Sequence, residues 1–153
     1  MFKKILSLLL FLIVVANCDY SPVYLKGENS KLNINIINFD GDSEINEIIV
    51  KEINQIANNN YSKKIDIKIN TNFVRTILAR NTKGTPTDFE LKAISNFKVT
   101  HSDKEQNFAI EEKFNYKKMS NNYEQNNYEK TIKKNIASSI TRKLILRLTI
   151  AEW

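Results

Sequence analysis

The spacing of the apolar residues changes along the chain, and these changes limit the fold to a combination of strands and helices. In residues 31–39 apolar side chains alternate with polar ones, mostly asparagines, a pattern typical of a half-buried strand. From residue 45 to residue 57 isoleucines recur at steps of three and four, which predicts an amphipathic helix. Asp42 or Ser43 is the expected N-cap of this helix, and the asparagines at 58–60 are expected to end it.

A period of two then returns and predicts three further strands, at residues 65–79, 89–99 and 108–116. Residues 81–86 have the composition of a turn, in which Gly84 can adopt a positive φ at no steric cost. Residues 101–106 are expected to form the second turn, so that the three strands make an antiparallel meander. A strand of 14 or so residues before the first turn would be about 45 Å long, whereas the first helix would span only about 24 Å. The tip of this hairpin should therefore project beyond the helical layer.

A last helix is predicted from residue 123 onward, because apolar residues recur there at four-residue steps: Tyr128, Ile132, Ile136, Ile140, Leu144 and Leu148. The order strand, helix, three strands, helix predicts a single α+β domain over residues 31–153. In this fold two helices pack on one face of a four-stranded mixed sheet (β-α-β-β-β-α). If the first two strands pair in parallel, the helix between them makes a right-handed crossover. The opposite face of the sheet would then meet solvent or a partner.

The N-terminal segment has the features of an export signal. Two lysines precede an apolar run over residues 5–16, and Cys18, the only cysteine of the chain, follows that run. This pattern predicts a signal peptide over residues 1–17 that is too short to span a bilayer comfortably. A cysteine at the cleavage point indicates a lipoprotein, in which Cys18 is lipidated and residues 18–30 form the anchor and its tether. Asn17 stands where a small residue is usual, and the alternative is a secreted protein that never receives lipid.

Composition adds only weak constraints. The net charge of +6 falls to +4 once Lys3 and Lys4 leave with the signal, and lysine, asparagine and isoleucine are all abundant. This mild basicity is better explained by a solvated lysine surface than by a polyanionic partner, so no nucleic-acid partner is expected. A single cysteine allows no disulfide framework within the chain, and the fold must depend on packing alone.

The residues needed for catalysis are sparse. The chain has one histidine, His101, which falls in a predicted turn and is expected to be solvated. Three glycines in the whole chain do not suit a glycine-rich phosphate loop. The paired carboxylates are better explained as helix-start and surface residues: Asp40 with Asp42, and Glu111 with Glu112. We therefore expect no enzymatic activity, no cofactor and no metal site.

Two segments are suited to binding. Arg75, Arg80 and Lys83 lie near the first turn of the meander, where three cationic side chains gathered at one end could contact phosphate groups. Charged residues also occupy turns simply because water is there, and this alternative is equally open. The tyrosine- and asparagine-rich segment 116–128 suits either an interface or a domain edge.

Several of these features together resemble a known family. Residues 18–24 (CDYSPVY) resemble the opening of the alphaproteobacterial lipopolysaccharide-assembly lipoprotein family LptE. The order of the elements, an arginine in the second strand (Arg75), the tyrosine-containing approach to the last helix and the segment 136–144 are also similar to that family.

The resemblance implies a non-enzymatic, lipid-anchored protein on the periplasmic side of the outer membrane. Members of the family occupy the lumen of the β-barrel protein LptD, assist its assembly and help to deliver lipopolysaccharide to the cell surface. On this interpretation the partners are an LptD-like barrel, lipopolysaccharide and the membrane, and Arg80 and Lys83 are expected to contact phosphorylated lipid A. The alternative is a generic structural lipoprotein of the envelope that has no glycolipid ligand.

Overall fold

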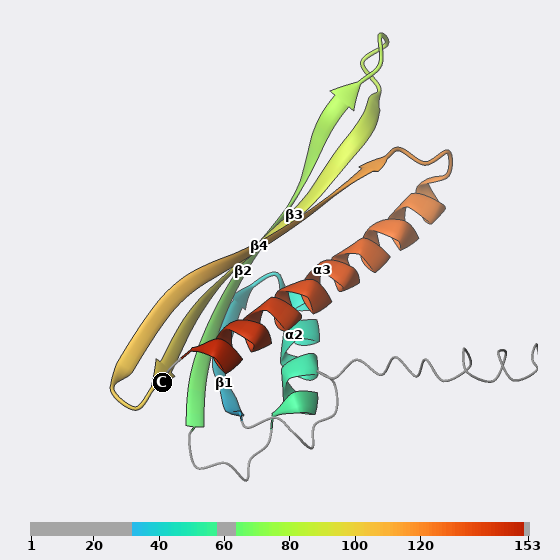
Figure 1. Cartoon of the computed structure of the whole chain (residues 1–153). Helices are drawn as coiled ribbons and strands as arrows, with labels where there is room; N and C mark the ends of the chain where they lie inside the picture. Colours follow the sequence, from blue (N-terminus) through green and yellow to red (C-terminus); the bar gives the residue numbers. More distant parts are fainter. Residues whose placement is uncertain (1–31, 58–63, 152–153) are drawn as a thin grey trace, which may run out of the picture.

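The computed structural model describes residues 32–57 and 64–151, which form one α+β domain (Figure 1). The predicted signal peptide, Cys18 and the tether over 18–30 lie outside the described residues. Along the chain the elements are β1 (Asn33–Gly41), α2 (Ser43–Ile56), β2 (Lys64–Arg80), β3 (Pro86–His101), β4 (Lys104–Lys117) and α3 (Asn122–Ile150). This order confirms the predicted β-α-β-β-β-α class.

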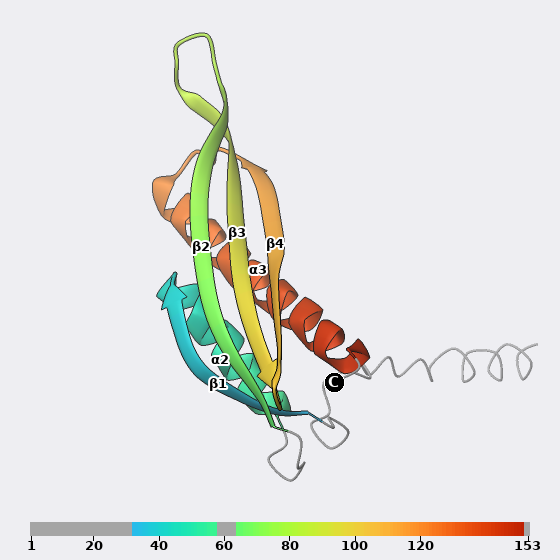
Figure 2. The same ribbon diagram turned by 90° about the vertical axis from the view of Figure 1, so that its left-hand side faces the viewer.

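The four strands form one mixed sheet in the order β1-β2-β3-β4, so that the order in space follows the order in the chain (Figure 2). β1 pairs with β2 in parallel, whereas β2 with β3 and β3 with β4 pair antiparallel, as the meander predicts. The register places Ile67 opposite Val99 and Ser95 opposite Ile110. Because side chains alternate along a strand, this register sends one set of side chains from all four strands to the same face.

Both helices cover that face, and the opposite face carries no helix (Figures 1 and 2). α2 packs over β1 and β2, while the longer α3 crosses β3 and β4 and also contacts α2. The core between the layers is built of aliphatic side chains with few aromatics, and its largest fully buried members are Phe97, Ile45, Ile49, Ile53, Ile67, Ile69, Leu91, Ile140, Leu144 and Leu148. Within residues 32–57 and 64–151, neither helix combines the length and apolar character that crossing a membrane requires.

The link between β1 and α2 depends on a glycine that the sequence pattern did not single out. Gly41 has a φ of +89°, and a Cβ atom placed there would lie 2.0 Å from the carbonyl oxygen of Thr71 on β2. This close approach lets the backbone N–H of Asp42 donate to the same oxygen at 2.8 Å. Asp42 then caps α2, since its Oδ1 accepts from the backbone N–H of Ile45 at 3.0 Å, which confirms one of the two predicted caps.

Buried polar groups hold α2 to the sheet. The Thr71 hydroxyl lies 2.7 Å from both the Asn46 side-chain oxygen and the Ser95 hydroxyl. The Asn46 amide in turn donates to the backbone oxygen of Asp40 at 2.8 Å. Among the described residues, no buried side-chain nitrogen or oxygen lacks a hydrogen-bond partner. A network of this kind fixes the register of α2 because each member would be costly to leave unpaired.

The two turns of the meander differ from their predicted extents. β3 begins at Pro86, inside the predicted first turn, and the second turn is only Ser102 and Asp103 rather than residues 101–106. Ser102 has a φ of +53°, which lets a two-residue loop join the strands, so His101 pairs directly with Lys104. The β2–β3 hairpin extends past the end of β4 and the start of α3 (Figure 1), because β2 has 17 residues and spans about 56 Å.

Candidate functional site

One face of the sheet is not covered by a helix and is open to a partner (Figure 2). Its side chains alternate with the buried ones and are mostly polar; we call this surface the open face. Its polar members on β1 and β2 include Asn33, Asn35, Asn38, Asp40, Lys64, Asp66, Lys68, Asn70 and Asn72, and on β3 and β4 they include Lys92, Asn96, Lys98, Glu105, Asn107, Glu111 and Lys113. Val74, Ile94 and Ala109 are apolar members of the same face.

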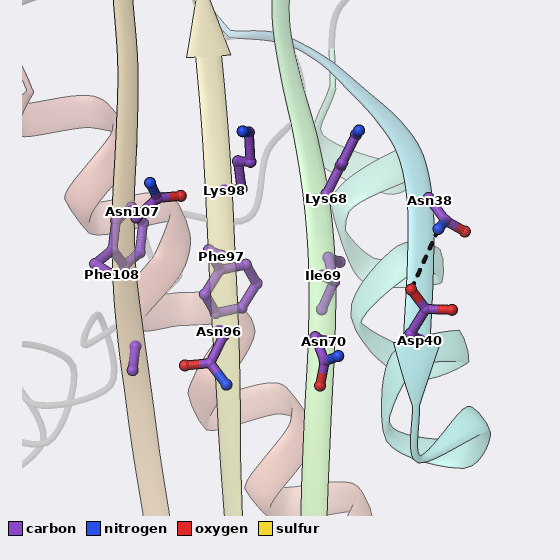
Figure 3. Close-up of a pocket in the computed structure, with 11 residues that line it drawn as sticks. Asn38, Asp40, Lys68, Ile69, Asn70, Asn96, Phe97, Lys98, Asn107 and Phe108 are labelled. Carbon is purple, nitrogen blue, oxygen red and sulfur yellow. Dashed lines mark hydrogen bonds between the residues drawn. The ribbon is translucent and has the colours of Figure 1, made fainter.

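Two rows of side chains cross the open face and border a shallow hollow of about 400 Å³ (Figure 3). The cross-strand register puts Asn38, Lys68, Lys98 and Asn107 in one row and Asp40, Asn70, Asn96 and Ala109 in the next. The Asn38 amide donates to the Asp40 carboxylate at 3.3 Å. Four asparagine amides, which both donate and accept hydrogen bonds, therefore line the hollow together with Asp40, two lysines and four apolar residues.

Opposite charges balance across the open face. Lys98 lies 2.6 Å from Glu105, and Lys92 lies 2.9 Å from Glu111 on the neighbouring strand. Hydrogen bonds from Lys98 and then Asn107 lower the pKa of the Glu105 carboxyl below its usual value. These exposed pairs contribute little to stability, but they leave the surface hydrophilic without a strong net charge.

The hairpin tip is ordered by its own polar contacts. Asn81 Oδ1 accepts from the backbone N–H groups of Lys83 and Thr85, at 3.0 and 2.9 Å. Gly84 has a φ of +78°, as the turn prediction requires, and its carbonyl accepts from the Arg80 guanidinium at 2.8 Å. Arg80 and Lys83 thus both lie at the exposed tip, where two cations are available to a ligand.

Arg75, by contrast, does not join them, and the predicted grouping of three tip cations is wrong for this residue. It lies on the helix-covered side of β2, where its Nε donates to the Tyr116 hydroxyl at 3.2 Å and to Glu129 at 3.1 Å. Its guanidinium also lies 3.9 Å from the centre of the Phe89 ring. The reason is side-chain alternation, since odd-numbered residues of β2 face the helical layer, and four residues of strand separate Arg75 from Arg80.

The contacts of Arg75 belong to a cluster that attaches the first turns of α3 to the sheet. The Tyr116 hydroxyl donates to Glu129, and the Gln125 amide donates to the same carboxylate oxygen at 3.0 Å. Burial, reinforced by the bond to Glu129, raises the pKa of the Tyr116 hydroxyl to about 12. Burial lowers the pKa of Arg75, but the bond to Tyr116 and the charge of Glu129 outweigh this effect and raise it overall. This part of the segment 116–128 therefore stabilises the fold.

His101 is not solvated as predicted. It is only 8% exposed, and its Nδ1 lies 2.9 Å from the backbone oxygen of Lys64 at the start of β2. The prediction was wrong because the second turn is shorter than its composition suggests, so His101 ends a strand and faces the core. In the described part of the chain, no three His, Cys, Asp or Glu side chains come together in a way that could hold a metal ion.

Comparison with known proteins identifies the type of fold. No protein-family model matches the sequence, and no curated protein sequence matches it. Among solved structures, the fold is shared with small bacterial lipoproteins. One is rare lipoprotein B from Shewanella oneidensis, with a TM-score of 0.53 and 16% identity, a match that covers 75% of this chain and 97% of that one. Another is a candidate lipoprotein from Caulobacter crescentus, with a TM-score of 0.52 and 14% identity over 80% of this chain and 91% of that one. At these identities the likeness establishes a common fold.

Proposed function

We propose that this chain is an envelope lipoprotein of the LptE type, anchored through Cys18 on the periplasmic side of the outer membrane. In this role it occupies the lumen of an LptD-like β-barrel, assists assembly of the barrel and helps to deliver lipopolysaccharide to the cell surface. The proposal is supported by the lipoprotein-like N-terminus, the resemblance of residues 18–24 and the fold shared with rare lipoprotein B.

The observation that carries the proposal is the character of the open face. A barrel lumen is lined by polar residues, so a plug needs a broad polar surface of low net charge. The asparagines that line the hollow and the balanced ion pairs of the open face meet this need. The four strands place the outer strand axes about 14 Å apart, a width that a large barrel can enclose.

Co-purification from barrel-containing membranes in mild detergent tests the barrel partner. We expect the chain to be recovered with a large outer-membrane barrel, and recovery only as a free monomer would contradict the proposal. The variant Asn70→Trp/Asn96→Trp places two bulky groups in the hollow and should reduce recovery of the barrel at least tenfold. Asn54→Trp, at an exposed position on α2, is the matched control and should leave recovery unchanged. An equal loss in the control would refute a role for the open face.

The hairpin tip provides a separate test of the glycolipid ligand. Charge reversal at Arg80 and Lys83 should weaken binding of lipopolysaccharide and flatten its dependence on salt, because screened ion pairs are lost. The control reverses Lys64 and Lys104, which lie at the other end of the sheet. Unchanged binding in the tip variant would remove the glycolipid contact from the proposal and favour a structural lipoprotein that has no such ligand.

A further inference from the structure

The second half of β2 has a neighbouring strand on one side only. The parallel register of β1 with β2 ends where Gly41 lies opposite Thr71, whereas β3 continues to pair with the other side of β2 as far as Arg80. Residues 72–77 therefore form an unpaired edge in line with β1, about 20 Å long, before the ladder becomes irregular after Ile77 (Figure 2). We call this edge the strand slot.

Backbone hydrogen-bonding groups point into the strand slot at every second residue. The N–H of Asp42 donates to the Thr71 carbonyl at 2.8 Å, so the backbone groups of Thr71 point toward the side of β1. Because successive residues of a strand direct these groups to opposite sides, those of Phe73, Arg75 and Ile77 point to the same side as those of Thr71. No strand within residues 32–57 and 64–151 pairs with them there.

The strand slot lacks the features that normally keep an exposed edge from pairing. Natural edges are blunted by charged side chains, proline or a bulge. The slot contains one charged residue, Arg75, whose side chain is bonded to Tyr116 and Glu129 in the helical layer. Its exposed apolar residues are Val74 and Ile77, which are 45% and 38% exposed. The slot is thus open to a further strand.

The other two edges of the sheet are protected in the usual way. The ladder of β1 with β2 is interrupted by a register shift between Ile36 and Asn38. The outer edge of β4 carries charged residues at both ends and in the middle: Lys104, Glu105, Glu111, Glu112, Lys113 and Lys117. The contrast within one sheet indicates that the strand slot is kept for a partner.

We propose that the strand slot receives an extended segment of the barrel polypeptide as an additional strand of the sheet. This inference rests on the proposed function, and the slot borders the surface assigned there to the barrel wall, since Val74 belongs to both. Strand addition supplies main-chain hydrogen bonds for affinity and side-chain contacts at alternate positions for specificity. A second copy of this chain fits poorly, because antiparallel pairing would bring its residues 78–80 onto the end of β1.

The side chains around the strand slot define the chemistry of the incoming segment. Asp40 lies on the open face just before the slot, is exposed, and forms no ion pair within 4 Å among the described residues. A lysine or arginine opposite Asn72 would follow Asp40 by about 7 Å along the same strand line and could reach its carboxylate. On the helical side, Phe73 and Ile77 favour apolar cross-strand neighbours. The segment should therefore carry a basic residue at this end and apolar residues at alternate positions.

Co-purification of the full chain with the barrel, in mild detergent, tests the added strand. The Ile77 N–H points into the slot, so Ile77→Pro removes a donor without breaking the β2–β3 ladder and should reduce recovery of the barrel about tenfold. Ile77→Ala keeps the N–H and should reduce recovery by no more than about threefold. Asn115→Pro is the matched control on the outer edge of β4 and should leave recovery unchanged. Its N–H points away from β3, because that of Lys118 donates to Thr87 on β3 and the direction alternates.

Photo-crosslinking provides a second measurement that needs no proline. p-Benzoylphenylalanine in place of Val74 or Thr76 should crosslink to one barrel segment, at positions two residues apart, because paired strands keep their register. The same group in place of Asn96, in the middle of the open face, should crosslink to a different segment. Far-ultraviolet circular dichroism checks that both proline variants fold, and the crosslinks decide the outcome if Ile77→Pro does not.

The inference is overturned if Ile77→Pro and Asn115→Pro recover the barrel equally well. Crosslinks from Val74 and Thr76 that map to separate segments, or to a second copy of this chain, would also overturn it. In these cases recovery of the barrel with the wild-type chain leaves the proposed function standing. A wild-type chain that recovers no barrel contradicts both.

Discussion

Replacing Gly41 by alanine should destabilise the domain far more than a single methyl group normally does. The new Cβ would lie 2.0 Å from the Thr71 carbonyl oxygen, and the backbone φ of +89° is one that side chains other than glycine rarely adopt. The strained backbone costs about 1–3 kcal/mol. To relieve the clash, β1 would have to move away from β2, and the hydrogen bond from the Asp42 N–H to Thr71 would be lost, which costs about 1 kcal/mol. The same movement disturbs the Asp42 cap of α2, which costs about another 1 kcal/mol.

The expected loss is therefore about 3–5 kcal/mol, a large part of the about 5–15 kcal/mol by which a domain is stable. Chemical denaturation followed by far-ultraviolet circular dichroism measures it. Gly84→Ala is the control, since Gly84 has a similar φ of +78° but a Cβ atom there would meet no neighbouring atom within 4 Å. The control carries the backbone strain alone and should lose about 1–2 kcal/mol. Equal losses in the two variants would show that the backbone angle alone matters and would refute the role of the close approach to Thr71.

Two further perturbations follow from charged and polar contacts of the helices. The raised pKa of Tyr116 keeps its hydroxyl protonated in the folded chain, so the stability it provides is complete below pH 10 and is lost as the pH rises toward 12. The difference in unfolding free energy between the wild-type chain and Tyr116→Phe, measured by urea titration, should therefore fall by about 2 kcal/mol between pH 10 and pH 12. A difference that stays constant would contradict the contact between Tyr116 and Glu129. Lys133→Met should cost about 1–3 kcal/mol because it leaves Asp42 and Glu44 unpaired at the start of α2. Lys64→Met, which removes an exposed pair with Asp66, should change the free energy of unfolding by less than about 0.5 kcal/mol, and a similar cost for both variants would argue against the Lys133 contacts.

Element type and order were predictable because the apolar period is strong in every element. Alternation placed the strands, and four-residue steps placed α3, since a strand and a helix bury side chains at different intervals. The capping role of Asp42 was also visible, because an N-cap acts on residues that are near in sequence. These local rules need no knowledge of what lies across the sheet.

The errors arose where the outcome depends on distant partners. Arg75 stands in the sequence as one of three cations near a turn, but Tyr116 and Glu129, which bind it, come 41 and 54 residues later. His101 has the sequence context of a turn residue, but the register of β3 with β4 makes it the last residue of the strand. Gly41 gave no signal of its own, since its necessity comes from the Thr71 carbonyl on a neighbouring strand.

The sheet order that follows the chain order has a consequence for how the domain folds. β2, β3 and β4 are joined by short turns, so their pairing closes only small loops and costs little chain entropy. The parallel pairing of β1 must wait for a crossover through α2, and α3 meets α2 only after the whole meander intervenes. The meander is thus the expected folding nucleus: substitutions within it should slow folding, whereas substitutions in β1 and α2 should mainly accelerate unfolding.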